Sequence, residues 1–258
     1  MEIIKNAIRV GNSAGVLLPR KWLNSQVKVV LEPLNIERDI LEILLNEGIL
    51  KDVLGVYLIG SYARNEQTIE SDVDVLTITS NINKKINEKK YEIICVTGEE
   101  LKNQLEKNIL PILPMIKESR AIINESLIKD YITHPLTRKN LRFHIETSKS
   151  ALNVIEEAIK ISKEQKEGVS DNIVYSLVLR LREVYIVECL IKNKSWSNKE
   201  LIKLIKEISG SEEAYHGYLR AKNNEDVRKD LKIQEAKNIY EHIKKKIKEQ
   251  EKWAGKRK

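Results

Sequence analysis

The sequence predicts an α+β protein in three parts: a small β-rich unit, a domain built on a mixed sheet, and a C-terminal helical bundle. Three features support this class. Short apolar runs separated by turn residues open the chain, which is typical of hairpin strands. Longer apolar runs at residues 53–59, 72–79 and 91–97 are bounded by glycine or polar turns, as buried strands are. From about residue 137 onward, apolar residues recur at helical spacing.

The composition fits a folded chain of this kind. At about 100–200 residues per domain, 258 residues suffice for one large domain or a few smaller ones. Hydrophobic residues make up 41% and charged residues 32%, but aromatic residues only 5%, so the core must consist mostly of Ile, Leu and Val. Cys95 and Cys189 lie in apolar segments, which favours small core residues over a disulfide or a zinc site.

The charge balance is basic, with a formal net charge of +7 and a pI of about 9.1. This allows a polyanionic substrate or RNA, although a lysine-rich solvated surface explains it at least as well. No apolar run is long enough to span a membrane, and the first residues lack a signal-peptide pattern. We therefore expect no membrane partner and a cytoplasmic location.

The stretch from residue 58 to residue 76 carries the candidate chemistry. A buried strand meets the Gly60-Ser61 turn, and a second strand then opens with Asp72-Val73-Asp74. Because alternate strand residues point to opposite faces, Asp72 and Asp74 are expected on one face. Two such carboxylates repel each other unless a cation lies between them or water covers them, and Mg²⁺ prefers oxygen ligands of this kind. The alternative is a plain strand-turn-strand with solvated carboxylates.

The turn itself has the features of an anion site. Gly60 has no Cβ, so the backbone can approach a ligand closely. We expect Ser61 to cap a short helix that carries Arg64, because free N–H groups at a helix start bind anions. A phosphate cradle beside a carboxylate pair suits phosphoryl or nucleotidyl transfer, in which positioning and charge neutralisation supply most of the catalysis.

These residues resemble the signature of the nucleotidyltransferases of the DNA polymerase beta superfamily. Gly60-Ser61, ten residues, and then Asp72-Val73-Asp74 match it, and Ala63-Arg64 and Ser71 extend the match. The similarity is greatest to the branch of kanamycin nucleotidyltransferase and the minimal nucleotidyltransferases. Asn65 departs from the glycine that many relatives carry in this variable loop.

The resemblance implies a metal-dependent enzyme that moves a nucleoside monophosphate from a nucleoside triphosphate such as ATP to an acceptor hydroxyl, releasing pyrophosphate. Asp72 and Asp74 would hold two Mg²⁺ ions, and the third carboxylate of the family falls on Glu92, which would ligate one ion or act as general base. The alternative for Glu92 is a solvent-facing strand residue. Gly60, Ser61 and Arg64 would bind the nucleotide. The acceptor stays open between a small molecule, a protein and an RNA end.

Residues 1–34 form a separate unit ahead of the nucleotidyltransferase domain, 35–135, and the bundle, 136–258. Strands are expected at 2–10, 16–19 and 27–31, with a helical turn at 20–24. The pattern resembles the swapped-hairpin domains of AbrB-like proteins, which implies a homodimer, since a unit this small cannot bury a core alone.

Such domains commonly bind DNA, and here basic residues could face phosphates: Lys5, Arg9, Arg20, Lys21 and Lys28. A dimerisation clip without DNA contacts is the favoured interpretation, because an enzyme domain follows. The rival function for the whole chain is a DNA-binding regulator or antitoxin-like protein with a weakly active transferase fold.

The remaining elements follow from apolar spacing. Helices are expected at residues 34–47, 99–108, 115–130, 138–165, 172–193, 197–208, 211–222 and 226–253. We expect a loop, with or without a helical turn, at 80–87, which is polar, and a loop or a kinked connection at 109–115, because Pro111 and Pro114 interrupt helices. Arg138 and His144 fit the loose pattern of HEPN ribonucleases, but this short pattern arises easily by chance in a chain rich in lysine and arginine.

Overall fold

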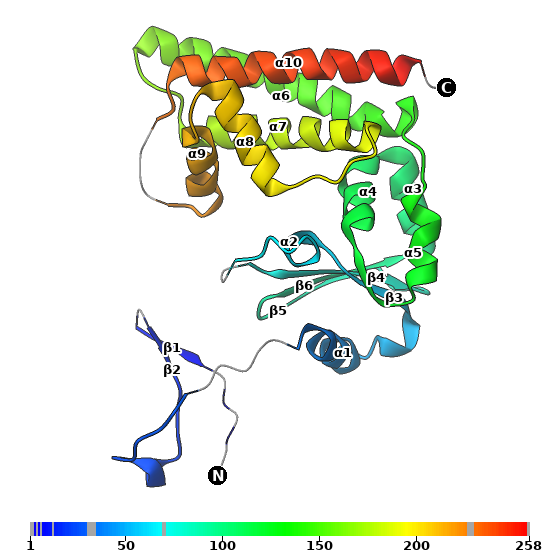
Figure 1. Cartoon of the computed structure of the whole chain (residues 1–258), viewed down its shortest axis with the longest axis vertical. Coiled ribbons are helices and arrows are strands. Elements are labelled where there is room, and N and C mark those ends of the chain that lie inside the picture. Colours follow the sequence, from blue (N-terminus) through cyan, green and yellow to red (C-terminus); the bar gives the residue numbers. More distant parts are fainter. Residues whose placement is uncertain are drawn as a thin grey trace. The chain divides into compact units, whose positions relative to one another are not determined.

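The computed structural model describes residues 3, 5, 7–11, 13–29, 35–68, 71–225 and 230–256, in two compact units, Met1–Asn35 and Ile36–Lys258 (Figure 1). Parts of the predicted strands at 2–10 and 27–31, and the predicted start of the last helix at 226, lie outside the described residues. The second unit contains both the sheet and the bundle, and the predicted boundary near residue 135 stays a prediction.

The first unit contains one antiparallel hairpin, in which β1 (Ile8–Val10) pairs with β2 (Ser13–Gly15). A 3-10 turn, η1 (Arg20–Trp22), follows where a helical turn was expected. The strand expected at 16–19 is wrong, and the described part of 27–31 is not a strand either. No described residue of this unit is buried, so the hairpin lacks the apolar cover that a stable sheet needs.

The second unit is built on a mixed sheet of five strands, which confirms the predicted α+β class. The strands lie in the order β5-β6-β4-β3-β7. Their bounds are β3 (Val53–Leu58), β4 (Val73–Thr79), β5 (Lys84–Glu88), β6 (Tyr91–Thr97) and β7 (Arg120–Ile123). The central pair β4 and β6 is parallel, and the other neighbours are antiparallel.

Strand alternation gives the sheet two apolar faces. On one face, α1 (Ile36–Asn46) and the turn η2 (Leu50–Asp52) precede β3, and α1 buries Ile40 and Leu44 against Val73 and Val75 (Figure 1). On the other face, Leu76 and its neighbours pack against α3 (Gly98–Lys107) and α4 (Ile109–Glu118). Residue 74 lies on this second face, because it alternates with the two valines.

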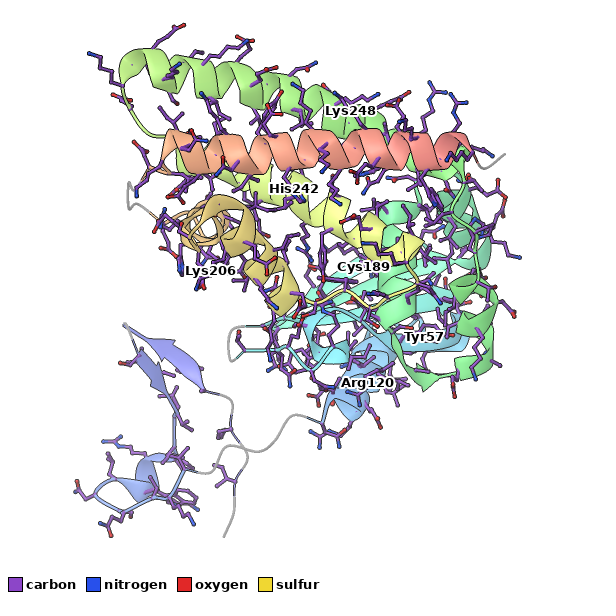
Figure 2. All side chains as sticks on the ribbon, turned by 45° about the horizontal axis from the view of Figure 1, so that its top comes forward. Tyr57, Arg120, Cys189, Lys206, His242 and Lys248 are labelled. Atoms are coloured by element: carbon purple, nitrogen blue, oxygen red, sulfur yellow. The ribbon has the colours of Figure 1, made fainter. Side chains whose placement is uncertain are left out.

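The bundle continues the core of the second face. The short helix α5 (Glu125–Ile132) precedes the bundle. The bundle helices are α6 (Arg138–Gln165), α7 (Asp171–Ile191), α8 (Asn198–Ser209), α9 (Glu213–Lys222) and α10 (Ile233–Gly255). One apolar cluster runs from the sheet into the bundle, and α4 contacts both α6 and α7. Cys95 and Cys189 are both buried and unbridged, as expected of small core residues, and Figure 2 labels Cys189. Among the described helices, none has the length and apolar character needed to cross a membrane.

Three expectations for residues 80–130 are wrong. The polar segment at 80–87 was expected to be a loop, but it contributes the edge strand β5. The side chains of β5 are exposed except for Ile86 and the partly covered Glu88, and exposed charged side chains are common on sheet edges. The segment at 109–115 is helical, because Pro111 lies in the first turn of α4, where its missing N–H has no intrahelical partner. The helix expected at 115–130 is divided into the end of α4, then β7 and α5, and Asn124 caps α5 with a left-handed backbone.

The two faces of α1 give the first test. Ile40 is fully buried against the sheet, so Ile40→Ala should lower the free energy of unfolding by about 2–4 kcal/mol. Leu45 is 61% exposed on the same helix, so Leu45→Ala should cost less than about 0.5 kcal/mol. Equilibrium urea unfolding measures both. Equal losses would contradict the docking of α1 described above.

Candidate active site

Two acidic residues meet on adjacent strands at one end of the sheet. Asp74, in β4, is the direct neighbour of Glu92 in the parallel strand β6, and both are half-buried. Asp72 lies just before β4 and is exposed. Val73 and Val75 are buried on the opposite face, as the predicted alternation requires.

The environment of Asp74 is unfavourable for a carboxylate. Burial raises its pKa to about 6, and the negative charges of Glu92, Asp72 and Glu118 act in the same direction. Arg64 opposes them without outweighing them. Three other acidic side chains therefore act on Asp74, and Arg64 offsets only part of their effect.

The metal-ligating role predicted for Asp72, Asp74 and Glu92 stays a prediction. Within the described ranges, no group of three or more His, Cys, Asp or Glu side chains is already arranged to hold a metal ion. Glu92 forms an ion pair with Lys85 of β5, with 2.7 Å between Oε1 and Nζ. Carboxylate oxygens that repel one another nevertheless fit Mg²⁺ by their chemistry, and Glu92 is open enough to exchange its partner, since its side chain is 38% exposed.

Gly60 is pressed against Asp74. Its φ of +69° lies in the left-handed region, and a Cβ added there would lie 2.1 Å from Asp74 Oδ2. The Ile59 amide donates to the carbonyl of Asp74 at 2.9 Å, which holds the turn beside β4. A residue with a Cβ does not fit between the turn and the carboxylate without displacing Asp74, whereas the close approach to a ligand expected at Gly60 stays a prediction.

Ser61 does not have the capping role expected of it. The helix it was expected to cap, α2 (Gly60–Ala63), has Ile59 as its N-cap and no side-chain cap hydrogen bond. The left-handed Gly60 starts the helix one residue early, so Ser61 lies inside the first turn. Its nucleotide-binding role remains a prediction.

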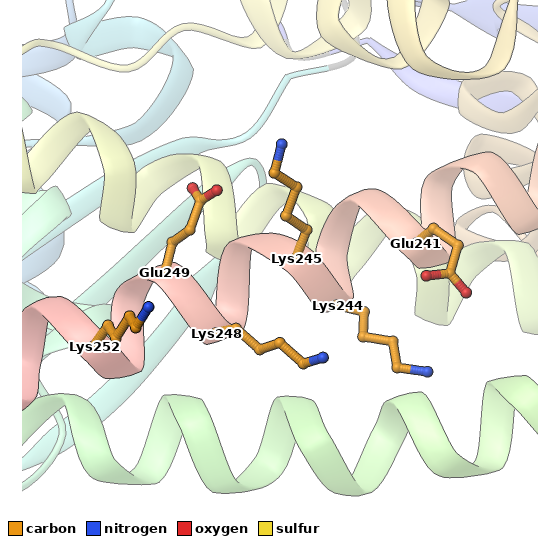
Figure 3. Close-up of a pocket in the computed structure, with 6 residues that line it drawn as sticks. All are labelled: Glu241, Lys244, Lys245, Lys248, Glu249 and Lys252. Atoms are coloured by element: carbon orange, nitrogen blue, oxygen red, sulfur yellow. The ribbon is translucent and has the colours of Figure 1, made fainter.

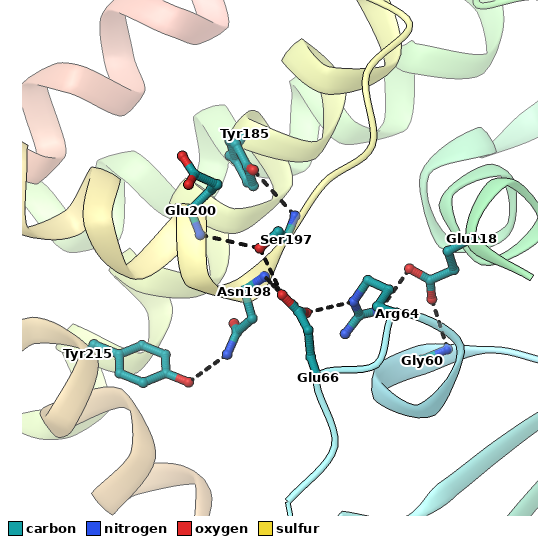
Figure 4. Close-up of polar contacts among 9 residues, drawn as sticks. All are labelled: Gly60, Arg64, Glu66, Glu118, Tyr185, Ser197, Asn198, Glu200 and Tyr215. Atoms are coloured by element: carbon teal, nitrogen blue, oxygen red, sulfur yellow. Dashed lines mark hydrogen bonds and ion pairs between the residues drawn. The ribbon is translucent and has the colours of Figure 1, made fainter.

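Arg64 is held on several sides (Figure 4). Its Nε lies 2.9 Å from Glu66 Oε2, and its Nη1 lies 2.7 Å from Glu118 Oε2. The guanidinium also lies over the Trp196 ring, 3.9 Å from the centroid. Such contacts fix the orientation of a guanidinium, so Arg64 is not a freely exposed helix arginine.

Glu66 extends this network into the bundle. It accepts a hydrogen bond from Ser197 Oγ at 2.7 Å and lies 3.2 Å from the Asn198 amide at the start of α8 (Figure 4). Burial alone would raise the pKa of Glu66, but the hydrogen bonds from Arg64, Ser197 and Asn198 lower it below the usual value. The turn after β3 is therefore tied to α8 through one carboxylate.

The sequence interpretation did not single out Glu66, Glu118 or Trp196. No sequence motif marks Glu118, because it lies 58 residues after Gly60 in the chain. Its carboxylate nevertheless accepts the hydrogen bond of the Gly60 amide at 2.9 Å. Trp196 comes from the connection between α7 and α8. Only the fold brings these residues to the turn.

Other features carry no comparable chemistry. A cavity of about 680 Å³ along α10 is lined by Glu241, Lys244, Lys245, Lys248, Glu249 and Lys252, all from one helix (Figure 3). His144 is buried and hydrogen-bonded to Gln250 at 3.0 Å, whereas Arg138 is exposed, so the two do not form an open nuclease pair. His242 is half-buried on α10, where burial lowers its pKa (Figure 2).

Comparison with protein families identifies the class of the domain that holds this site. Residues 37–132 match the family model of the nucleotidyltransferase domain, a range that includes Gly60, Asp72, Asp74, Glu92 and Glu118. The chain thus contains a nucleotidyltransferase domain of the kind that its turn and carboxylates resemble.

Two solved structures are similar to this chain. A nucleotidyltransferase-like protein from Exiguobacterium sibiricum 255-15 is 12% identical, covers 86% of this chain and 78% of its own, and has a TM-score of 0.41. Spectinomycin adenyltransferase AAD(9) from Enterococcus faecialis, solved with ATP and spectinomycin, is 14% identical. The match covers 82% of this chain and 98% of the adenyltransferase chain, with a TM-score of 0.42. A comparison with curated proteins found no match.

The raised pKa of Asp74 predicts a pH-dependent stability. Its pKa rises from 3.8 to about 6 on folding, so its favourable contribution is present below pH 3.8 and is lost as pH rises through about 6. Asp74→Asn should therefore stabilise the protein at pH 8, in the presence of a chelator, by about 1–2 kcal/mol after allowance for water screening. At pH 4 the difference should disappear.

Denaturant unfolding at the two pH values measures this effect. Asp72→Asn is the matched control, and its effect should be smaller because Asp72 is exposed. A loss of stability at pH 8 in Asp74→Asn would show that the carboxylate crowding described above is wrong.

Proposed function

We propose that this nucleotidyltransferase moves a nucleoside monophosphate from a nucleoside triphosphate to an acceptor hydroxyl in a Mg²⁺-dependent reaction. The observation that supports this most strongly is the crowding of Asp74 by Glu92, Asp72 and Glu118 against the Gly60 turn. Crowded carboxylates beside a glycine turn are useful when cations and a polyanion bind between them.

Asp72, Asp74 and Glu92 are the residues that would hold Mg²⁺, two ions being the expected number. When bound, these ions would neutralise the triphosphate and lower the pKa of the acceptor hydroxyl. The carboxylates on adjacent strands β4 and β6 belong to a rigid part of the sheet, so their positions need little adjustment.

The turn would bind the leaving part of the nucleotide. Gly60 and Ser61 would hold phosphate oxygens through the backbone, and Arg64 would offset negative charge on the departing pyrophosphate. In the reaction a bond forms between the acceptor oxygen and the α-phosphorus, and the bond from that phosphorus to the bridging oxygen of the β-phosphate breaks. Glu92 would take the hydroxyl proton once it leaves Lys85.

The acceptor remains open among a small molecule, a protein hydroxyl and an RNA end. The network of Glu66, Ser197 and Trp196 joins the turn to the bundle, so an acceptor on the bundle side of the turn would meet the nucleotide directly. The basic net charge is compatible with each class and distinguishes none of them.

The first unit supports a homodimer. Its described residues expose seven large apolar side chains between 38% and 71%: Ile8, Val10, Leu17, Leu18, Leu23, Val27 and Val29. An unburied apolar set of this density in so short a unit favours a partner, and a second copy of the same hairpin is the partner that the AbrB-like pattern implies. DNA binding through Lys5, Arg9, Arg20, Lys21 and Lys28 is the alternative role.

Labelling tests the reaction. Incubation with each of ATP, GTP, CTP and UTP, labelled on the α-phosphate, together with Mg²⁺ and a cell extract should label one class of acceptor. The double variant Asp72→Asn with Asp74→Asn should reduce labelling by about 100-fold or more, because it removes the charges that would hold the metal. Absence of labelling with all four nucleotides, or labelling that persists in the double variant, would contradict the proposal.

Light scattering after size exclusion tests the homodimer. The full chain should have the mass of a dimer, and Leu17→Glu, at the side chain that is 71% exposed, should convert it to a monomer. Leu45→Glu, at an exposed apolar residue of the second unit, is the control and should remain dimeric. A monomeric parent chain would refute the dimer, and salt-sensitive duplex binding that persists in the Asp72/Asp74 double variant would favour the DNA-binding alternative.

A further inference from the structure

Glu118 places its carboxylate where the proposed reaction needs a phosphate. It is the last residue of α4, and its two oxygens take different donors. Oε1 accepts the Gly60 amide hydrogen bond at 2.9 Å, and Oε2 lies 2.7 Å from Arg64 Nη1 (Figure 4). Carboxylate and phosphate oxygens accept hydrogen bonds from the same kinds of donor. Two of the three residues expected to bind the nucleotide therefore already hold an internal anion.

The internal anion is held close to its donors by the fold. The Glu118 side chain is only 9% exposed, and the preceding turn of α4 is anchored by Ile116, which is fully buried. Arg64 is fixed from its other side by Glu66 and by the Trp196 ring. A carboxylate attached in this way competes at a high effective concentration, as tethered ligands do.

The position is nevertheless costly for Glu118. Its negative charge acts on Asp74, which already faces Glu92 and Asp72. A second cation, Arg182 of α7, attracts Glu118 by its charge, and no hydrogen bond joins the two among the described residues. The Arg182 guanidinium carbon lies 5.1 Å from the centroid of the Trp196 ring. Glu118 thus has a cation to turn toward when it leaves the turn, and leaving would relieve repulsion at Asp74.

We propose that Glu118 sets the nucleotide affinity of the site: its carboxylate occupies the Gly60 amide and the Arg64 guanidinium until a triphosphate displaces it. This inference rests on the proposed function, because it requires phosphate binding at Gly60 and Arg64. The displaced carboxylate stays on α4, so the exchange needs no unfolding of the turn. The internal anion keeps both donors paired, and Arg64 oriented, in the absence of nucleotide.

Removing the competitor should strengthen binding. Glu118→Gln has the same shape, and its amide oxygen can still accept from Gly60, but it no longer attracts Arg64 as a charge. If the internal anion occupies the donors in about nine molecules of ten, the variant should bind Mg²⁺-tripolyphosphate about tenfold more tightly than the parent chain. Isothermal titration with tripolyphosphate, and with each of the four nucleoside triphosphates, measures the change.

Two controls separate competition from simple loss of charge. Glu118→Asp keeps the charge but is one methylene shorter, so it cannot reach both donors and should also bind more tightly. This variant also answers the question if Glu118→Gln does not fold. Glu125→Gln removes one exposed charge from the same domain, with a side chain that is 70% exposed, and should leave the affinity unchanged.

The outcomes distinguish the inference from the function on which it rests. Tighter binding in both Glu118 variants, with no change in Glu125→Gln, supports the inference. Unchanged or weaker binding in Glu118→Gln and Glu118→Asp, while the parent chain binds, overturns the inference alone and leaves Glu118 as a support for Arg64. Absence of Mg²⁺-dependent triphosphate binding in the parent chain and in every variant overturns the proposed function as well.

Discussion

Repulsion among acidic side chains at one end of the sheet is the interaction on which this structure depends. Asp74 is half-buried, faces Glu92 across two hydrogen-bonded strands, and has Gly60 against its oxygen. An isolated carboxylate in such a place costs free energy, and the raised pKa is the direct sign of that cost. The fold tolerates it because a continuous apolar core, from the sheet into the bundle, stabilises the same unit. Carboxylates with such an electrostatic cost are expected at functional sites, where a bound ligand relieves the repulsion.

The same network positions the turn and the bundle relative to each other. Arg64 links Glu118 at the end of α4 to Glu66, and Glu66 links the turn to the start of α8. The guanidinium groups of Arg64 and Arg182 both lie over the Trp196 ring, 3.9 and 5.1 Å from its centroid. A change at the Gly60 turn therefore reaches the bundle through two or three side chains.

The sequence could predict the part of the site that is local in the chain. The strand, the glycine turn and the second strand occupy adjacent segments, so the sequence alone placed the Gly60 turn beside the carboxylate pair. Glu92 was placed on the neighbouring strand by its family resemblance, and β6 does pair with β4. The bundle helices were found because their apolar spacing is long and regular.

Glu118 could not be found, since its position depends on α4 running through two prolines and on the pairing of β7 with β3. The short strands β5 and β7 were missed because pairing, and not a strong apolar pattern, makes them strands. The capping role of Ser61 was wrong by one residue, because a left-handed glycine can start a helix.

The most direct test of the central claim is whether these carboxylates bind a divalent cation together with a nucleotide. Mn²⁺ can replace Mg²⁺ at oxygen ligands and is detected by electron paramagnetic resonance when free. Titration of the full chain into Mn²⁺ with a nucleoside triphosphate should remove more of the free signal than the nucleotide does alone, and the Asp72→Asn, Asp74→Asn double variant should abolish that excess. An equal loss of signal in the parent chain and the double variant, or no excess loss in either, would contradict the account.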